Sequence, residues 1–419
     1  MGSKKIYVHE CWTKDEPILM GCLYVDTLRG KETCSFEYDN DWLVNHAGQC
    51  FLDPDLQLYQ GRQYAPMDKT FFGLFSDSCP DRWGRLLMRR REAIIASREG
   101  RKPHQLLETD YLLGVHDEAR MGALRFSLEP NGPFLSHDND MAAPPWVMLR
   151  ELESASLAFE QDEDLLNDQW LKLLIAPGSS LGGARPKATV KDADGQLWIA
   201  KFPSRYDEMD CGAWEQVVHE LAKACGLSVP DSRLERFSEK GSTFLVKRFD
   251  RINQRRIHFS SAMALLGKSD GAGAGTGSSY LDLAGFITAY GSNPKDDLEE
   301  LWKRILFNMA VSNTDDHLRN HGFLLTKQGW RLSPLYDVNP VPYGDNLSLN
   351  VSSDDARIDP ELAIDVAPYF GIRRQTAQET ACSMFNTVKR LWQPLSEDYG
   401  LSKAAQKAMA PAFEVSMRG

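Results

Sequence analysis

The segment SNTDDHLRNHGF, from Ser312 to Phe323, constrains the fold more than any other part of the chain. Apolar residues at helical spacing between Leu298 and Ala310 predict an amphipathic helix that leads into it. Strand-like residues from Gly322 to Thr326 follow, then a turn at 327–329 and a return strand that ends at Leu332. A helix, a polar loop and a β-hairpin are therefore expected in direct succession.

A hairpin brings its two ends together. Asp315 and Asn320 precede the first strand, and Asp337 lies just beyond the second, so two carboxylates and a carboxamide are expected to converge. Such oxygen ligands suit Mg²⁺, which is held by one or two carboxylates plus substrate phosphates. In protein kinases a catalytic Asp is followed five residues later by a metal-binding Asn, and a further Asp binds the bridging metal. The five-residue spacing favours Asp315 as the base and leaves Asp316 a supporting role.

Upstream, the chain offers the other parts of a phosphoryl-transfer site. A glycine-rich loop at 177–184 precedes two strand-like runs joined by an Asp-Gly turn, and residues 209–225 have the spacing of an amphipathic helix. On the second strand, Lys201 suits a contact with the α- and β-phosphates, and Glu215 in the helix suits the carboxylate that orients it. Backbone N–H groups of Ser180, Leu181, Gly182, Gly183 and Ala184 are expected to cradle phosphates, with Lys187 adding charge.

The strand 244–250 is expected to form the adenine edge, with Asp250 near the ribose. His317 is a further candidate cofactor-binding residue. Because His317 and His321 lie in a loop rather than a helix, we favour structural hydrogen bonds over a metal pair for them.

Each of these features alone has a plainer interpretation. The glycine-rich loop alone indicates a turn, Lys201 alone a surface lysine, Glu215 alone a solvated helix face, and Asp315-Asp316-His317 a capped helix end. Their order along the chain, from glycine loop to lysine, glutamate, edge strand, Asp-x4-Asn and final Asp, is what favours a kinase-like site. A second glycine-rich run at 267–279 lacks a preceding strand and a Gly-Lys-Ser/Thr ending, which favours a connector.

Composition limits the remaining possibilities. The eight cysteines form no C-x-x-C pair, which predicts neither a zinc ribbon nor a disulfide framework and favours a reducing cytoplasm. The net charge of −11 predicts that DNA contacts would require a local basic patch or a separate partner protein. Alternating strands near the N-terminus, a helix over 80–97 and a Pro- and Asp-rich stretch at 130–145 suggest three segments. These are a β-rich subdomain at 1–145, a nucleotide-binding lobe at 146–255 and a mostly helical catalytic lobe at 256–419.

Taken together, these motifs match a known family. The chain resembles the HipA family, the kinase toxins of bacterial type II toxin–antitoxin systems. The resemblance extends over nearly the whole length. It rests on seven stretches: residues 75–85, 112–117, 120–126, 180–187, 247–251, 313–320 and 332–337.

This resemblance implies an α+β, two-lobed protein-kinase-like fold related to phosphoinositide kinases, with ATP and Mg²⁺ as cofactors. It implies a serine/threonine protein kinase directed at translation, typically at an aminoacyl-tRNA synthetase. Asp315 would be the catalytic base, and Asn320 and Asp337 the metal ligands. Lys247 and Phe249 would meet adenine through backbone atoms. The partner would be a small helix-turn-helix, HipB-like antitoxin that carries the DNA contacts. Ser180 matches the loop serine that family members autophosphorylate, and a phosphate there would repel ATP.

The sequence also departs from the family pattern. Phe259-Ser260-Ser261 replaces a Glu-Asp that usually follows the edge strand, and the connector at 267–279 is longer and richer in glycine. Both changes lie where an activation segment or a substrate-binding surface is expected, so they concern the identity of the substrate. A small-molecule phosphotransferase and a catalytically weak co-repressor acting with the antitoxin therefore stay open as alternatives.

Overall fold

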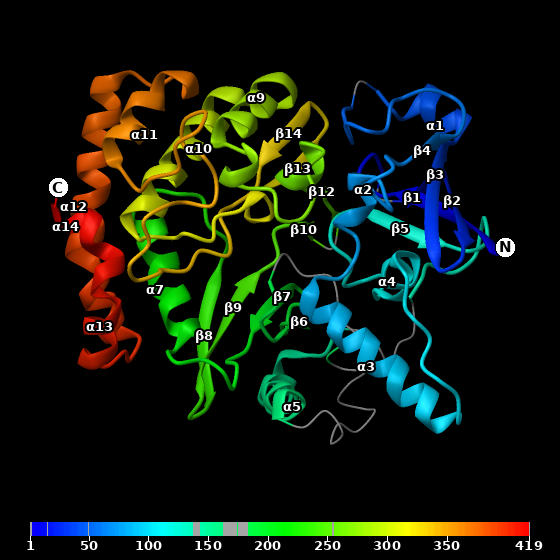
Figure 1. Cartoon of the computed structure of the whole chain (residues 1–419), viewed down its shortest axis with the longest axis horizontal. Helices are drawn as coiled ribbons and strands as arrows, with labels where there is room; N and C mark the ends of the chain where they lie inside the picture. The colour runs from blue at the N-terminus through cyan, green and yellow to red at the C-terminus, as the bar shows by residue number, and fades with distance from the viewer. Residues whose placement is uncertain are drawn as a thin grey trace. The chain divides into compact units, whose positions relative to one another are not determined.

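The computed structural model describes all residues except 1, 15, 49, 137–142, 162–173, 175–182, 254 and 419. The chain forms two compact units. The first unit comprises residues 1–205, 247–260 and 324–327, and the second comprises 206–246, 261–323 and 328–419. These units differ from the three consecutive segments predicted from the sequence, because two short pieces from the second half of the chain belong to the first unit. Figure 1 labels the helices and strands.

A five-stranded antiparallel sheet opens the first unit, in the order β4-β3-β2-β1-β5. Its strands are β1 (Gly2–Glu10), β2 (Ile18–Leu28), β3 (Lys31–Tyr38), β4 (Gln63–Tyr64) and β5 (Leu124–Ser127). Arg29 and Gly30 both have positive φ, 51° and 76°, as a two-residue hairpin between β2 and β3 requires. The apolar side chains of Ile6, Val8 and Phe36 are fully buried. The three N-terminal strands predicted from alternation are confirmed.

Helices and two small hairpins complete the first unit. They are α1 (Asn40–Asn45), α2 (Gly73–Ser76), α3 (Arg82–Arg98), α4 (Glu108–Gly114), α5 (Leu149–Gln161), the hairpin of β6 (Lys187–Lys191) and β7 (Leu197–Lys201), and the hairpin of β10 (Arg251–Ile252) and β11 (Arg255–Arg256). The helix predicted over 80–97 corresponds to α3, which Asp81 caps by accepting a hydrogen bond from the Gly84 N–H at 2.8 Å. The Asp-Gly turn between β6 and β7 has Gly195 at φ 76°.

The second unit is mostly helical. Its elements are α7 (Cys211–Ala224), β8 (Ser232–Ser238), α8 (Ala262–Leu265), α9 (Tyr280–Tyr290), α10 (Pro294–Ala310), β14 (Gly329–Leu332), α11 (Pro360–Val366), α12 (Arg374–Asp398), α13 (Lys403–Met409) and α14 (Glu414–Arg418). Three strands have residues in both units: β9 (Gly241–Lys247), β12 (Phe259–Ser261) and β13 (Gly322–Thr326). The predicted apolar stripe of α10 forms the core, since Leu301, Trp302 and Ile305 are fully buried. No helix in the described part of the chain is long and apolar enough to cross a membrane.

Helix α7 begins in close contact with the start of β9. Asp210 caps the helix by accepting from the Ala213 N–H at 3.1 Å. The same carboxylate accepts from the backbone N–H and the hydroxyl of Ser242, at 2.9 and 2.8 Å. Gly212 makes this approach possible, because a Cβ there would lie 2.1 Å from the Ser242 carbonyl oxygen. One aspartate and one glycine thus fix where α7 starts.

Candidate active site

The polar loop after α10 has a defined conformation. The Asn313 N–H donates to the Asn308 carbonyl at 2.8 Å, and Leu318–Asn320 form a single 3₁₀ turn before β13. Asp315 is exposed and the following residue, Asp316, is buried. The Asn320 side-chain amide donates to the Asp315 backbone carbonyl at 2.9 Å. This bond fixes the expected base and the expected metal ligand in one loop.

The β13–β14 hairpin returns the chain to this loop. The Ser333 N–H donates to the Gly322 carbonyl at 2.8 Å, which closes the open end of the hairpin. Three residues later, the Tyr336 hydroxyl donates to the Arg319 carbonyl at 2.6 Å. The direct neighbours of Asn320 and Asp337 in sequence are therefore in contact.

Two residues here adopt backbone conformations that are uncommon for side-chain-bearing residues. Ser312 has φ 52° and Asp337 has φ 58°. Such left-handed conformations cost about 1–3 kcal/mol each and persist where the surroundings determine them, often at ligand sites. Ser312 begins the loop, and Asp337 follows the hairpin and is half-buried.

The residues present fit a hard cation such as Mg²⁺. Asn320 is 1% exposed, and its side-chain oxygen has no hydrogen-bond partner among the described residues. Leaving a buried acceptor unpaired costs about 1–3 kcal/mol, which a bound cation would offset. Asn320 and Asp337 supply the oxygen ligands that Mg²⁺ prefers. Within the described ranges, no group of three or more His, Cys, Asp or Glu side chains is placed to hold a metal, so the candidate ligand set is this carboxamide and carboxylate.

Asp316 and His321 form a second pair, one residue further along the loop than Asp315 and Asn320, and both are buried. The Asp316 carboxylate accepts from the Tyr280 hydroxyl at 2.5 Å, from the Asn308 side-chain amide at 2.5 Å and from His321 Nε2 at 2.8 Å. Burial alone would raise the pKa of Asp316, but attraction to His321 and hydrogen bonds from His321 and Tyr280 outweigh it and lower that pKa. The spacing Asp316–His321 repeats the spacing Asp315–Asn320, but Asp316, His321 and Asn320 are buried and only Asp315 is exposed.

The two loop histidines differ in their surroundings. His321 is fully buried and bonded to Asp316, which agrees with the structural role expected for it. His317 is half-buried, and its Nδ1 atom is buried with no hydrogen-bond partner among the described residues. Glu215, the remaining predicted site residue of the second unit, lies on α7 and is 7% exposed.

The other predicted residues belong to the first unit. Lys201 ends β7 and is half-buried, and Gly183 has φ 85°. Lys187 begins β6, and its ammonium forms a buried ion pair with Asp81 at 3.0 Å. Its positive charge, expected at the phosphates, is therefore already neutralised by a carboxylate. Ser180, Leu181 and Gly182 lie outside the described residues.

The structure places Asp250 differently from the sequence-based prediction. Its carboxylate is fully buried and accepts from Arg248 at 2.9 and 2.7 Å, from Arg251 at 2.6 Å and from the Gly122 N–H at 2.8 Å. A carboxylate occupied in this way is not available to a ribose hydroxyl, which corrects the role predicted for it. Lys247 and Phe249 are half-buried, and the Phe249 ring packs on Phe259 at 6.1 Å.

Sequence reasoning missed the residues that support the loop. Tyr280 and Asn308 contact Asp316 from α9 and α10, at sequence separations of 36 and 8 residues. A tyrosine and an asparagine at such distances form no motif. The only available signal was the order of the segments, which does not identify individual contacts.

The chain is similar to several known proteins. Residues 179–392 match the family model described as the HipA-like C-terminal domain. Two curated relatives are "Putative kinase Y4mE" of Sinorhizobium fredii, 30% identical over 191 residues, and "Putative kinase" of Haemophilus influenzae, 29% identical over 188 residues. The first match covers 40% of this chain and 43% of the relative, and the second covers 39% and 54%. The chain thus spans about half the length of the curated relatives it matches.

A solved structure matches over nearly the full length. HipA of Shewanella oneidensis MR-1, determined with HipB and its operator DNA, superposes with a TM-score of 0.65 at 17% identity, covering 99% of this chain and 96% of that one. This likeness shows the fold, which is the α+β, two-lobed kinase-like fold expected from the sequence. Because the family model spans just over half of the chain, the protein belongs to the HipA-like C-terminal domain family.

Proposed function

We propose that the protein is an ATP-dependent serine/threonine protein kinase that acts as the toxin of a toxin–antitoxin pair. The observation that carries this proposal is the geometry of the loop after α10. An exposed Asp315 is tied through its backbone to Asn320, whose buried side-chain oxygen is unpaired among the described residues. Asp337 follows the hairpin that returns to this loop.

Each residue has a distinct task in this proposal. The Asp315 carboxylate accepts the proton of the acceptor hydroxyl as the phosphoryl group is transferred. Asn320 and Asp337 hold Mg²⁺, which neutralises charge on the phosphates when bound. Lys201 contacts the phosphates and Glu215 orients it. Lys187 holds β6 to Asp81, which leaves Lys201 as the principal phosphate lysine.

For the substrate, the partner and autoregulation, the proposal is supported by the family to which the chain belongs. The acceptor is a serine or threonine of a protein, such as an aminoacyl-tRNA synthetase. The partner is a small HipB-like antitoxin, as in the complex solved for the Shewanella oneidensis protein. Autophosphorylation of Ser180 adds about −1.5 to −2 charge beside the bound phosphates and switches the kinase off.

Phosphate transfer from radiolabelled ATP to the chain itself and to candidate synthetases tests this proposal. Asp315→Asn is expected to reduce transfer by about 10²–10⁴-fold, the usual contribution of a positioned general base. Asp398→Asn, an exposed carboxylate at the end of α12, serves as the matched control and is expected to retain wild-type transfer. Equal transfer by wild type and Asp315→Asn would contradict the assignment. Transfer to small alcohols or aminoglycosides, and to no protein, would instead identify a small-molecule phosphotransferase.

A further inference from the structure

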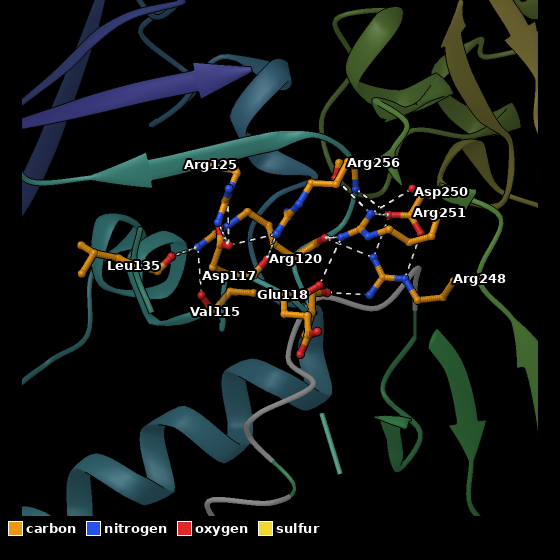
Figure 2. A network of polar contacts seen from close by, with 12 residues as sticks. Val115, Asp117, Glu118, Arg120, Arg125, Leu135, Arg248, Asp250, Arg251 and Arg256 are labelled. Carbon is orange, nitrogen blue, oxygen red and sulfur yellow. Dashed lines mark hydrogen bonds and ion pairs between the residues drawn. The ribbon is translucent and has the colours of Figure 1, made fainter. Parts of the chain in front are cut away.

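A buried network of charged side chains joins two distant parts of the first unit (Figure 2). Arg248, Asp250, Arg251 and Arg256 follow strand β9, and they meet residues 115–125 of the N-terminal part. The Arg248 guanidinium donates to the carbonyls of Ala119 and Arg120 at 2.6 and 3.1 Å. Further bonds run from Arg251 to the Glu118 and Arg120 carbonyls at 3.2 and 2.7 Å, and from Arg256 to Asp117 at 3.0 Å.

The residues of the predicted adenine edge alternate between this network and the opposite side. Arg248 is 3% exposed and Asp250 is fully buried, whereas Lys247 and Phe249 are half-buried. Successive side chains of an extended segment point to opposite faces. The two residues expected to meet adenine through backbone atoms therefore alternate with the two residues that the network holds.

Arg248 connects the network directly to the nucleotide-binding strands. Its backbone N–H donates to the Leu197 carbonyl of β7 at 2.9 Å, while its side chain bonds to Asp250 and to the carbonyls at 119 and 120. Lys201, the proposed phosphate lysine, ends the same strand β7. A displacement of residues 119–122 would thus reach the edge segment and β7 through one side chain.

Strand β6 is attached to the same N-terminal part at both of its ends. Lys187 forms its buried ion pair with Asp81, and the Trp83 indole N–H donates to the Lys187 carbonyl at 3.1 Å. Lys191, at the other end, pairs with Glu118 at 2.6 Å. We call residues 78–126 the scaffold segment, because they contact both ends of β6 and the segment that follows β9.

From these contacts we propose that the scaffold segment positions the nucleotide-binding strands, and that Arg248 and Asp250 are positioning residues for the adenine edge. The inference rests on the proposed function, because it assumes that residues 247–249 bind the base. The scaffold segment needs no contact with nucleotide to set the affinity, since it determines how often the edge adopts its binding-competent form. Loosening it raises the apparent dissociation constant in inverse proportion to the binding-competent fraction that remains.

Gly122 offers a test that removes no charge. Its N–H donates to Asp250, its φ is 74°, and a Cβ would lie 3.0 Å from the Phe259 backbone nitrogen. Gly122→Ala therefore displaces the network at the Asp250 carboxylate. If the competent population falls to about one tenth, the dissociation constant of a fluorescent ATP analogue with Mg²⁺ rises about tenfold, while kcat at saturating ATP stays at the wild-type value.

Two further variants of the full-length chain complete the experiment. Arg251→Lys keeps the charge but removes the guanidinium nitrogen that donates to the Glu118 and Arg120 carbonyls, and it is also expected to raise the dissociation constant. Lys69→Met removes the ion pair with Asp55, at 2.6 Å, in the first unit but outside the scaffold segment, and is the control for general destabilisation. Wild-type nucleotide affinity in folded Gly122→Ala and Arg251→Lys would overturn the inference, as would an equal loss in Lys69→Met. Absence of nucleotide binding by the wild type would overturn the proposed function, and this inference with it.

Discussion

Asp315 and Asp316 are neighbours in the chain with opposite surroundings. Asp315 is exposed, whereas Asp316 is 1% exposed and accepts three hydrogen bonds. The spacing to Asn320 distinguished the two from sequence alone. The partners of Asp316 were not predictable, because they come from α9, from α10 and from the first residue after the 3₁₀ turn.

Asp316→Asn is expected to lower both stability and activity. An amide cannot accept from Tyr280, Asn308 and His321 as the carboxylate does, and hydrogen bonds to a charged group contribute about 1.5–3 kcal/mol. The free energy of unfolding in urea should fall by about 2 kcal/mol. Displacement of the adjacent Asp315 should lower kcat by up to about 10²-fold.

Asp315→Asn is the contrasting variant. As an exposed side chain it should leave the free energy of unfolding within about 0.5 kcal/mol of wild type while transfer is lost. Wild-type stability in Asp316→Asn would refute the supporting role of Asp316.

At the scale of elements, the close approach of α7 to β9 depends on a missing side chain. Gly212→Ala places a methyl group 2.1 Å from the Ser242 carbonyl oxygen, so the backbone of one element must move. Such overpacking costs about 1–3 kcal/mol, to be measured as a lower urea midpoint. Glu215 lies in the first turns of α7, so ATP affinity is expected to fall as well.

Gly285 provides the control, because a Cβ there meets nothing within 4 Å and the residue is exposed on α9. Gly285→Ala should stabilise the chain by about 0.5–1 kcal/mol, as alanine does in helices. A loss of stability at position 285 similar to that at 212 would show that the steric account of Gly212 is wrong.

Elements with a clear periodicity were predictable. The helices α7 and α10 and the hairpins of β6–β7 and β13–β14 follow from residue spacing and turn residues. Strand β8 was missed because its sequence, SRLERFS, has charged residues at three of seven positions and no member of it is buried. The contact that occupies Asp250 could not be predicted, because Gly122, its neighbour in space, is 128 residues away in the sequence.

At the scale of the whole molecule, one histidine couples stability to pH. His258 is 2% exposed, stacks on Trp12 with ring centroids 4.6 Å apart, and accepts from the Leu325 N–H through its carbonyl at 2.9 Å. Three distant parts of the first unit therefore meet at this residue. Burial lowers the pKa of His258 to about 3.

The sign of the pH effect follows from this depressed pKa. Below about pH 6.5 the unfolded chain binds a proton at this imidazole that the folded chain excludes, so stability falls as the pH drops from about 6.5 toward 3. In His258→Phe this contribution is absent. The difference in unfolding free energy between pH 7.5 and pH 4.5 should shrink by about 2–3 kcal/mol in urea titrations. His104→Gln, at an exposed histidine, is the control, and an unchanged pH dependence in His258→Phe would contradict the prediction.

The division into units could not be read from the sequence. Composition placed boundaries near residues 145 and 255, whereas the chain changes unit after residues 205, 246, 260, 323 and 327. Short segments that return to the first unit, such as residues 324–327, have no distinctive composition. They are determined by pairing, as in the bond from Leu325 to His258.

This interleaving has a consequence during synthesis. The first unit includes residues 324–327, so a ribosome must translate about three quarters of the chain before that unit has all its parts. The stretch 206–246 emerges meanwhile without the 261–323 and 328–419 portions of its own unit. The loop at 312–323 and both units are therefore completed late, after most of the chain has been made. A short product from early termination would lack this loop.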